Sequence, residues 1–144
     1  MKTIRAVIDT SVLVAASRSH LGASFRVLRE IRAGTCVPLL SVPLLLEYEA
    51  VLKRPEHLAA SCRTLQLTDA FLDALCLLAE PVHLHYLWRP QLRDPGDEMV
   101  LETALNGRAD ALVTLNGKDF VAASRFGMPV IGPGDLLAQL RKEK

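Results

Sequence analysis

The 144-residue sequence has few aromatic side chains, almost no net charge and only three cysteines. Aromatic residues make up 5% of the chain and hydrophobic residues make up 50%, so we expect a core of aliphatic side chains. A formal net charge of +1 argues against a protein that grips nucleic acid through a basic field alone. It leaves room for an enzyme that approaches phosphates through bound cations.

The sequence also lacks the signals of a secreted or membrane protein. Cys36, Cys62 and Cys76 form no CxxC pair, so neither a zinc knuckle nor a disulfide framework is indicated, and we expect free, buried thiols in a reducing cytoplasm. The longest hydrophobic run, Val37 to Leu46, is broken by prolines and is too short to span a bilayer. The N-terminus has no long apolar core of a signal peptide. We expect a soluble, cytoplasmic, single domain over residues 1–144.

Short apolar runs alternate with helical patterns along the chain. The predicted strands are residues 6–8, 36–40, 81–86, 111–114 and 129–131. The predicted helices cover residues 11–17, 25–34, 41–54, 68–80 with Thr68 as the N-cap, 97–105, 119–125 and 134–142. A polar loop is expected over residues 88–96. This alternation predicts an α/β domain with a central parallel sheet.

Polar side chains stand where two of the predicted strands end. Asp9 directly follows the first strand, and in open parallel sheets ligands bind beyond the carboxyl ends of the strands. An Asp at this position can equally cap the next helix, and both interpretations stay open. Thr114 ends another buried strand and is followed by Asn116 and Asp119. Asn116 can form a turn with Gly117, and Asp119 can simply begin a helix.

Two further acids lie on the inward side of predicted helices. Glu47 comes three residues after Leu44 and four before Val51, so it borders an apolar face. A carboxylate there needs a metal or a partner such as Arg54 to offset its desolvation. Glu49 is expected to be solvated.

Asp97 shares a helix face with Val100 and Leu101 and is predicted to point inward. Asp94 is the expected N-cap of this helix, with Pro95 as its first residue. The alternative for Asp97 is the third position of a capping box.

The four acids become informative when they are considered together. Carboxylates that share one cleft repel one another unless divalent cations bind there. Hard oxygen ligands suit Mg²⁺ or Mn²⁺ rather than zinc. A pair of such ions ~4 Å apart is a common device for the in-line attack of water on a phosphodiester.

Four segments of the chain, Val7–Leu13, Leu46–Tyr48, Asp94–Ala104 and Ala109–Phe120, resemble the PIN-domain family. They resemble most closely the branch of toxin components of toxin–antitoxin systems. The resemblance covers nearly the whole chain in the expected order, including the closing Val130–Pro133. It implies a three-layer α/β/α fold and a Mg²⁺- or Mn²⁺-dependent endoribonuclease.

The resemblance also assigns residues. The three metal-binding acids of the family correspond to Asp9, Glu47 and Asp97, and Ser11 and Thr114 correspond to its polar positions. Many members carry an Asp two residues after that Thr, where this chain has Asn116, so Asp119 is the candidate for the missing charge. The predicted catalytic residues are Asp9, Ser11, Glu47, Asp97, Thr114, Asn116 and Asp119, and the four acids among them are the predicted metal ligands.

The resemblance further implies an RNA substrate, a cognate antitoxin protein and a homodimer. Arg89, Arg93 and Lys118 are candidates for steering the phosphate backbone. His83 and His85 share a strand face, for which exposure on an edge strand is favoured over a metal pair. A haloacid-dehalogenase-like phosphatase is disfavoured, because it requires a second Asp where Ser11 stands. The remaining rival is a catalytically weakened PIN-like module that binds RNA or protein.

Overall fold

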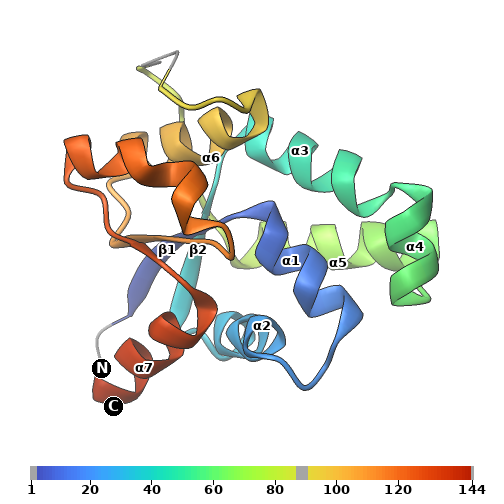
Figure 1. Ribbon diagram of the computed structural model, residues 1–144. Helices are drawn as coiled ribbons and strands as arrows, with labels where there is room; N and C mark the ends of the chain where they lie inside the picture. Colours follow the sequence, from blue (N-terminus) through green and yellow to red (C-terminus); the bar gives the residue numbers. More distant parts are fainter. Residues whose placement is uncertain (1–2, 87–90, 144) are drawn as a thin grey trace.

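The structure, a computed structural model, describes residues 3–86 and 91–143. Its centre is a parallel sheet of five strands in the order β3-β2-β1-β4-β5 (Figure 1). The strands are β1 (Ile4–Ile8), β2 (Cys36–Leu40), β3 (Glu80–Pro81), β4 (Ala111–Val113) and β5 (Val130–Ile131). The predicted α/β class and the parallel sheet are confirmed.

Helices cover both faces of this sheet. They are α1 (Thr10–Arg18), α2 (Ala23–Ala33), α3 (Val42–Leu52), α4 (Pro55–Ser61), α5 (Leu65–Leu78), α6 (Pro95–Asn106), the 3₁₀ helix η1 (Gly117–Phe126) and α7 (Pro133–Glu143). Helix α6 packs on β1, β2 and β4, whereas α2 packs on β2 and on α7 (Figure 1). The result is the predicted three-layer α/β/α arrangement.

The order of the strands places a switch point beside the central strand. From β1 the chain moves outward to β2 and β3, and it then returns to add β4 and β5 on the other side of β1. Strands β1 and β4 therefore pair directly, with Ala6 opposite Ala111 and Ile8 opposite Val113. In open α/β sheets the crevice at the carboxyl ends of such a strand pair is the usual position of a ligand.

The core is aliphatic, as the composition predicts. Ala6, Val7 and Ile8 of β1 are fully buried because helices lie on both faces of the strand. Tyr48 of α3 is one of the few buried aromatic residues, and its hydroxyl donates a hydrogen bond to the carbonyl oxygen of Ile8. This contact fixes α3, which carries Glu47, against the end of β1.

The predicted strand over residues 81–86 is wrong in its extent. Glu80 and Pro81 pair with β2, and the N–H of Val82 donates one further hydrogen bond to the Leu40 carbonyl oxygen at 2.9 Å. Beyond them a side chain of α6 takes the place of a neighbouring strand. The Asn106 Oδ1 accepts hydrogen bonds from the backbone N–H groups of His85 and Tyr86, both at 3.0 Å, and its Nδ2 donates to the Tyr86 carbonyl. The predicted exposure of His83 and His85 is confirmed, but without an edge strand.

Two helix starts also differ from the prediction. The sequence does not predict helix α4, because the Arg54–Pro55 pair is typical of a helix end, whereas Pro55 here lies in the first turn of a new helix. The N-cap of α5 is Thr64, whose side chain accepts a hydrogen bond from the Leu67 N–H at 3.1 Å. The predicted cap, Thr68, is buried inside the helix instead.

Of the predicted loop over residues 88–96, residues 88–90 lie outside the described ranges and Pro95 begins α6.

All three cysteines are free thiols, as predicted, but the predicted burial is wrong for Cys62 and Cys76, which are exposed. Cys36 is buried, and burial raises the pKa of its thiol to about 12. Across residues 3–86 and 91–143, no helix has both the length and the apolar character needed to cross a membrane.

Gly107, directly after α6, allows a close approach that a larger residue would block. An added Cβ would lie 2.8 Å from Cγ2 of Val82, 3.0 Å from Cδ1 of Leu39 and 3.0 Å from the Thr103 carbonyl oxygen. We expect Gly107→Ala to lower the free energy of unfolding by about 1–3 kcal/mol in urea denaturation, because the packed neighbours must move. Gly134→Ala in α7 is the control, since its Cβ would have no neighbour within 4 Å. Equal stability of the two variants would contradict this account of the packing.

Candidate active site at the carboxyl edge of the sheet

Asp9 lies at the switch point and is held there by two hydroxyl groups. It follows β1 and is only 5% exposed. Its Oδ2 accepts a hydrogen bond from Ser11 Oγ at 2.7 Å and another from Thr114 Oγ1 at 2.7 Å. Its side chain makes no capping hydrogen bond to α1, although the residue occupies the N-cap position. Of the two interpretations of Asp9, side-chain capping of α1 is therefore not found, and the ligand-binding interpretation stays a prediction.

The backbone after β4 orients both hydroxyl groups. The N–H of Leu115 donates to Ser11 Oγ at 3.2 Å, and the N–H of Asn116 donates to Thr114 Oγ1 at 3.0 Å. Each hydroxyl oxygen thus accepts a hydrogen bond from a backbone N–H of the loop, and its own proton is free to be donated to Asp9. Within the described ranges no group donates to the other oxygen, Oδ1 of Asp9, which remains available to a ligand.

Glu47 reaches the same region from α3. It is half-buried, and it forms no ion pair with Arg54 or with any other cation of the described residues. A Cβ on Gly96 would lie 3.1 Å from Glu47 Oε1, so the absence of a side chain there lets the carboxylate approach the first turn of α6. Glu49 is exposed and pairs with Lys53 at 3.3 Å, as its predicted solvated position implies.

Asp94 and Asp97, the two acids at the start of α6, have different structural roles. Asp94 is the N-cap, and its Oδ1 accepts a hydrogen bond from the Gly96 N–H at 2.8 Å. The Asp97 side chain makes no capping contact, and it is half-buried on the side of the helix that carries the buried Val100 and Leu101. The predicted cap and the predicted inward direction of Asp97 are therefore both found.

Electrostatics single out Asp97 among these acids. Burial raises the pKa of its carboxyl group from the usual 3.8 to about 7, and the negative charges of Asp9, Asp94, Asp119 and Glu47 add to the rise. The effect of four neighbouring acids on one carboxyl group shows that negative charge is in excess here. Such an excess favours a bound cation.

Asp97 lies at the junction of two hollows in the surface. The first hollow, of about 530 Å³, is lined by Asp9, Ser11, Glu47 and Asn116 together with Arg18 and Arg54. The second, of about 670 Å³, is lined by Asp119 together with Arg93 and Lys118. Asp94 and Asp97 line both. The seven predicted site residues therefore gather at one edge of the sheet, although Asn116 and Asp119 are exposed and face different hollows.

The donor set suits a hard divalent cation. It offers carboxylate oxygens and the amide of Asn116, and no Lys or Arg of the described residues pairs with Asp9, Glu47, Asp97 or Asp119. In the positions adopted here, the described part of the chain contains no group of three or more His, Cys, Asp or Glu side chains arranged to hold a metal ion. Binding would therefore require some of these side chains to rotate.

Several contributors to the site are absent from the sequence-based prediction. Arg18 and Arg54 line the first hollow, but they come from helix ends far apart in the sequence. Glu98 is buried, and its Oε1 accepts from the backbone N–H groups of Gln91 and Leu92 at 2.6 and 2.7 Å, which fastens the segment that leads into α6. The one sequence signal for Glu98 is its position four residues after Asp94, at the start of the same helix. Arg89, a predicted phosphate-steering residue, lies outside the described residues.

The comparison with known families agrees with the geometry. The family model described as PIN domain matches residues 5–118, which include all of the predicted site except Asp119. No curated protein matches the chain.

Asp97→Asn is expected to stabilise the metal-free protein, and to do so more at pH 8 than at pH 5. Because the pKa of Asp97 is raised to about 7 in the folded chain, the unfolded chain loses this proton first as the pH rises. The carboxyl therefore destabilises the fold progressively between pH 3.8 and about 7, and by a constant amount above that. Urea midpoints measured in EDTA at both pH values test this.

Asp73→Asn, at an exposed position on α5, makes the same charge change and serves as the control. An Asp97→Asn variant that gains no more stability at pH 8 than at pH 5 would show that the acids do not interact as described.

Proposed function

This chain belongs to the PIN-domain family, and from that premise we propose that it is a metal-dependent endoribonuclease. PIN domains are generally nucleases, which are hydrolases of phosphodiester bonds. The observation that carries the proposal is the position of Asp9. A buried carboxylate with one oxygen clamped by two hydroxyls and the other available to a ligand stands at the switch point of the sheet, beside the perturbed Asp97.

The acids themselves argue for the cation. A phosphate group is repelled by Asp9, Glu47 and Asp97, so the phosphate to be cleaved can reach them only when positive charge intervenes. Asp9, Glu47 and Asp97 would hold Mg²⁺ or Mn²⁺, with Asn116 or Asp119 as candidates for a second position. Bound there, a divalent cation neutralises negative charge on the phosphate and lowers the pKa of a coordinated water.

The remaining residues of the site position the acids. Ser11 and Thr114 hold Oδ2 of Asp9 and so restrict its rotamer before any ligand arrives. Tyr48 anchors α3 to the end of β1 and thereby sets the distance between Glu47 and Asp9. Such preorganisation lowers the reorganisation needed when the substrate binds.

The biological role follows the branch that the sequence resembles. We propose a toxin of a toxin–antitoxin pair, acting in the cytoplasm and bound by a cognate antitoxin protein, with a homodimer as the free form. Exposed leucines on α5 support contacts with another protein, since Leu77 is 88% and Leu67 is 55% exposed.

A second candidate is a PIN-like module that binds RNA or protein but has lost most of its catalytic power. The observation that favours it is Asn116, which supplies an amide oxygen at the position where many members have a carboxylate. One negative charge fewer weakens the hold on a second cation. The two candidates differ in whether RNA is cleaved when Mn²⁺ is present.

The decisive variant is Asp9→Asn. It keeps the shape of the side chain while removing the charge, so we expect Mn²⁺-dependent cleavage of RNA to fall by at least about 10³-fold. The measurement is the cleavage of a fluorescent RNA over a titration of Mn²⁺, with circular dichroism to show that the fold is kept. Asp73→Asn is the matched control and is expected to cleave like the wild type.

Full activity of Asp9→Asn would refute the site assignment. RNA binding by the wild type without cleavage at any Mn²⁺ concentration would favour the module.

A further inference from the structure

We propose that the acidic cleft is the middle of a track for one RNA strand. On one side of the acids Arg18 and Arg54 bind its phosphates, and on the other side Arg93 and Lys118 do so. This inference rests on the proposed function, because it describes how the substrate of that same site is held. It goes further in naming the residues at each end and in committing to a single strand.

The first end of the track combines two arginines from separate elements. Arg18 is the last residue of α1, and Arg54 is the N-cap of α4. Both side chains are exposed and line the first hollow with Asp9 and Glu47. Arginine is well suited to this position because its planar guanidinium can bind a phosphate through two parallel hydrogen bonds.

Arg18 and Arg54 form no ion pair with the neighbouring acids of the described residues. The ion pairs found among residues 3–86 and 91–143 join Arg5 to Glu80 and Lys53 to Glu49 and Asp69, all outside the two hollows. Arg18 and Arg54 stand in a hollow rich in carboxylates and pair with none of them. Their positive charges therefore remain available to a phosphate.

Arg18 is also held in place. Its Nη2 lies 2.6 Å from Nδ1 of His57 in α4. A guanidinium can only donate, so the imidazole must accept at Nδ1. This contact joins the end of α1 to α4 and restricts the arginine side chain before RNA arrives, which reduces the conformational entropy lost on binding. His57 is a positioning residue in this account.

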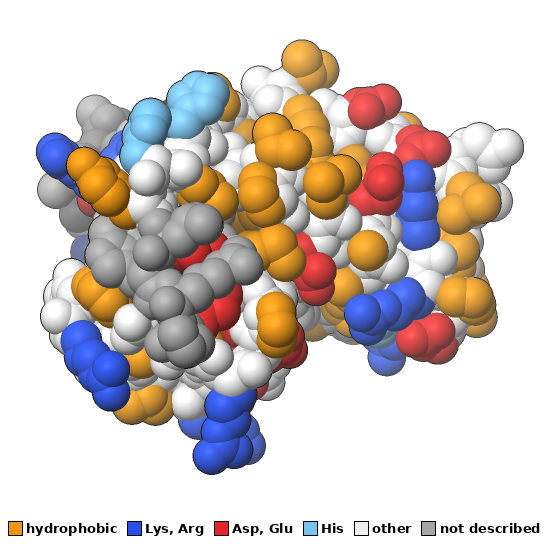
Figure 2. Space-filling model, turned by 90° about the horizontal axis from the view of Figure 1, so that it is seen from above, with side chains coloured by type: hydrophobic (Ala, Val, Ile, Leu, Met, Phe, Trp, Pro, Cys, Tyr) orange, Lys and Arg blue, Asp and Glu red, His pale blue; other side chains and the backbone are white. Residues whose placement is uncertain are grey.

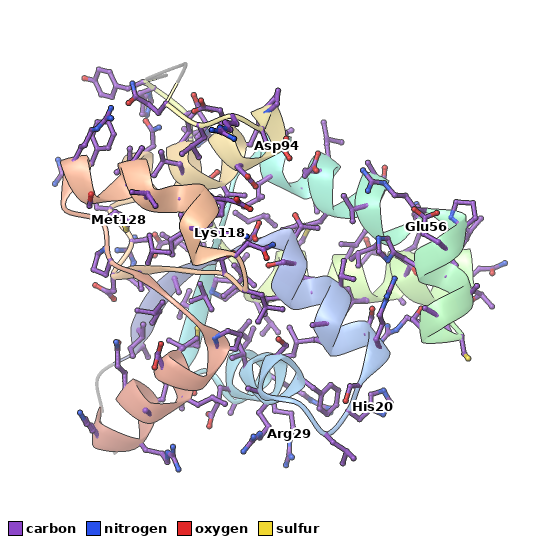
Figure 3. The ribbon with its side chains drawn as sticks, in the orientation of Figure 1. His20, Arg29, Glu56, Asp94, Lys118 and Met128 are labelled. Atoms are coloured by element: carbon purple, nitrogen blue, oxygen red, sulfur yellow. The ribbon has the colours of Figure 1, made fainter. Side chains whose placement is uncertain are left out.

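The second end of the track lies beyond Asp97. Arg93 and Lys118 are exposed and line the second hollow with Asp119, and neither pairs with a carboxylate of the described residues. Figure 3 shows Asp94, which precedes α6, in the upper part of the view and Lys118, at the start of η1, below it near the middle. Seen from above, the surface of the molecule carries side chains of both signs of charge (Figure 2).

This distribution of charge matches a strand that passes through the site. Because Asp94 and Asp97 line both hollows, each pair of cations shares a hollow with these acids: Arg18 and Arg54 line the first, and Arg93 and Lys118 line the second. A strand bound at both ends presents an internal phosphate to the acids, as an endonuclease requires. Asp9 is only 5% exposed, so a flexible single strand can reach it more readily than a rigid duplex.

The test measures how RNA binding depends on salt. A single-stranded oligonucleotide is bound by Asp9→Asn protein in EDTA, where it cannot be cut, and its anisotropy is followed from low to high salt. Each lost phosphate contact is expected to lower the slope of log K against log salt by about 0.7. Arg18→Ala/Arg54→Ala and Arg93→Ala/Lys118→Ala should therefore each lower it by about 1.4.

Three comparisons make the result specific. Arg26→Ala/Arg29→Ala removes two charges from α2, where Figure 3 places Arg29 far from Lys118 and Asp94, and should leave the slope unchanged. Arg18→Lys should keep the slope, because a positive charge remains. His57→Ala should weaken binding without changing the slope, because it frees the Arg18 side chain and removes no charge.

Cleavage assays on the wild-type background separate this inference from the proposed function. The track predicts that the two cleft variants, Arg18→Ala/Arg54→Ala and Arg93→Ala/Lys118→Ala, raise KM and change kcat little. Wild-type protein that cleaves RNA, with unchanged KM and salt slope in both cleft variants, would overturn the track and leave the nuclease intact. An equal loss of slope in the α2 control, or duplex RNA bound as tightly as single-stranded RNA, would also overturn it. Wild-type protein that neither binds nor cleaves RNA would overturn both proposals.

Discussion

Two hydroxyl groups, from Ser11 and Thr114, donate to a single carboxylate oxygen of Asp9, and the rest of the site is arranged around this contact. The contact joins the ends of β1 and β4, the strands between which the order of the sheet reverses. It is supported by the backbone N–H groups of Leu115 and Asn116, which occupy the lone pairs of the two hydroxyls. The direction and the burial of the Asp9 side chain thus follow from the topology of the sheet.

The other acids depend on the same frame. Tyr48 ties α3 to the carbonyl of Ile8, and Gly96 lets Glu47 approach the first turn of α6. Asp97 then lies close enough to its neighbours for burial and their charges to raise its pKa to about 7. A site that concentrates negative charge in this way stabilises the fold poorly by itself, which is the expected cost of a cleft prepared for cations.

Much of this could be predicted from local sequence. Strand β2 was located to the residue, and Asp94 as an N-cap followed from the Asp-Pro-Gly-Asp pattern, because capping and hydrophobic periodicity depend on near neighbours. Contacts between distant segments could not be predicted. The replacement of a strand by Asn106 and the convergence of Arg18, His57 and Arg54 depend on how α6, α1 and α4 pack, and no local pattern encodes that. The observed N-cap of α5 is Thr64 rather than the predicted Thr68, because the helix begins one turn earlier than the hydrophobic pattern indicates.

The central claim is that Asp9 is the principal ligand of a divalent cation. Anomalous diffraction from crystals soaked in Mn²⁺ tests it most directly. The account predicts a manganese peak at about 2.1 Å from Oδ1 of Asp9, with Asp97 or Glu47 as a further ligand. An ordered crystal that is saturated with Mn²⁺ and shows no peak at Asp9 would contradict it.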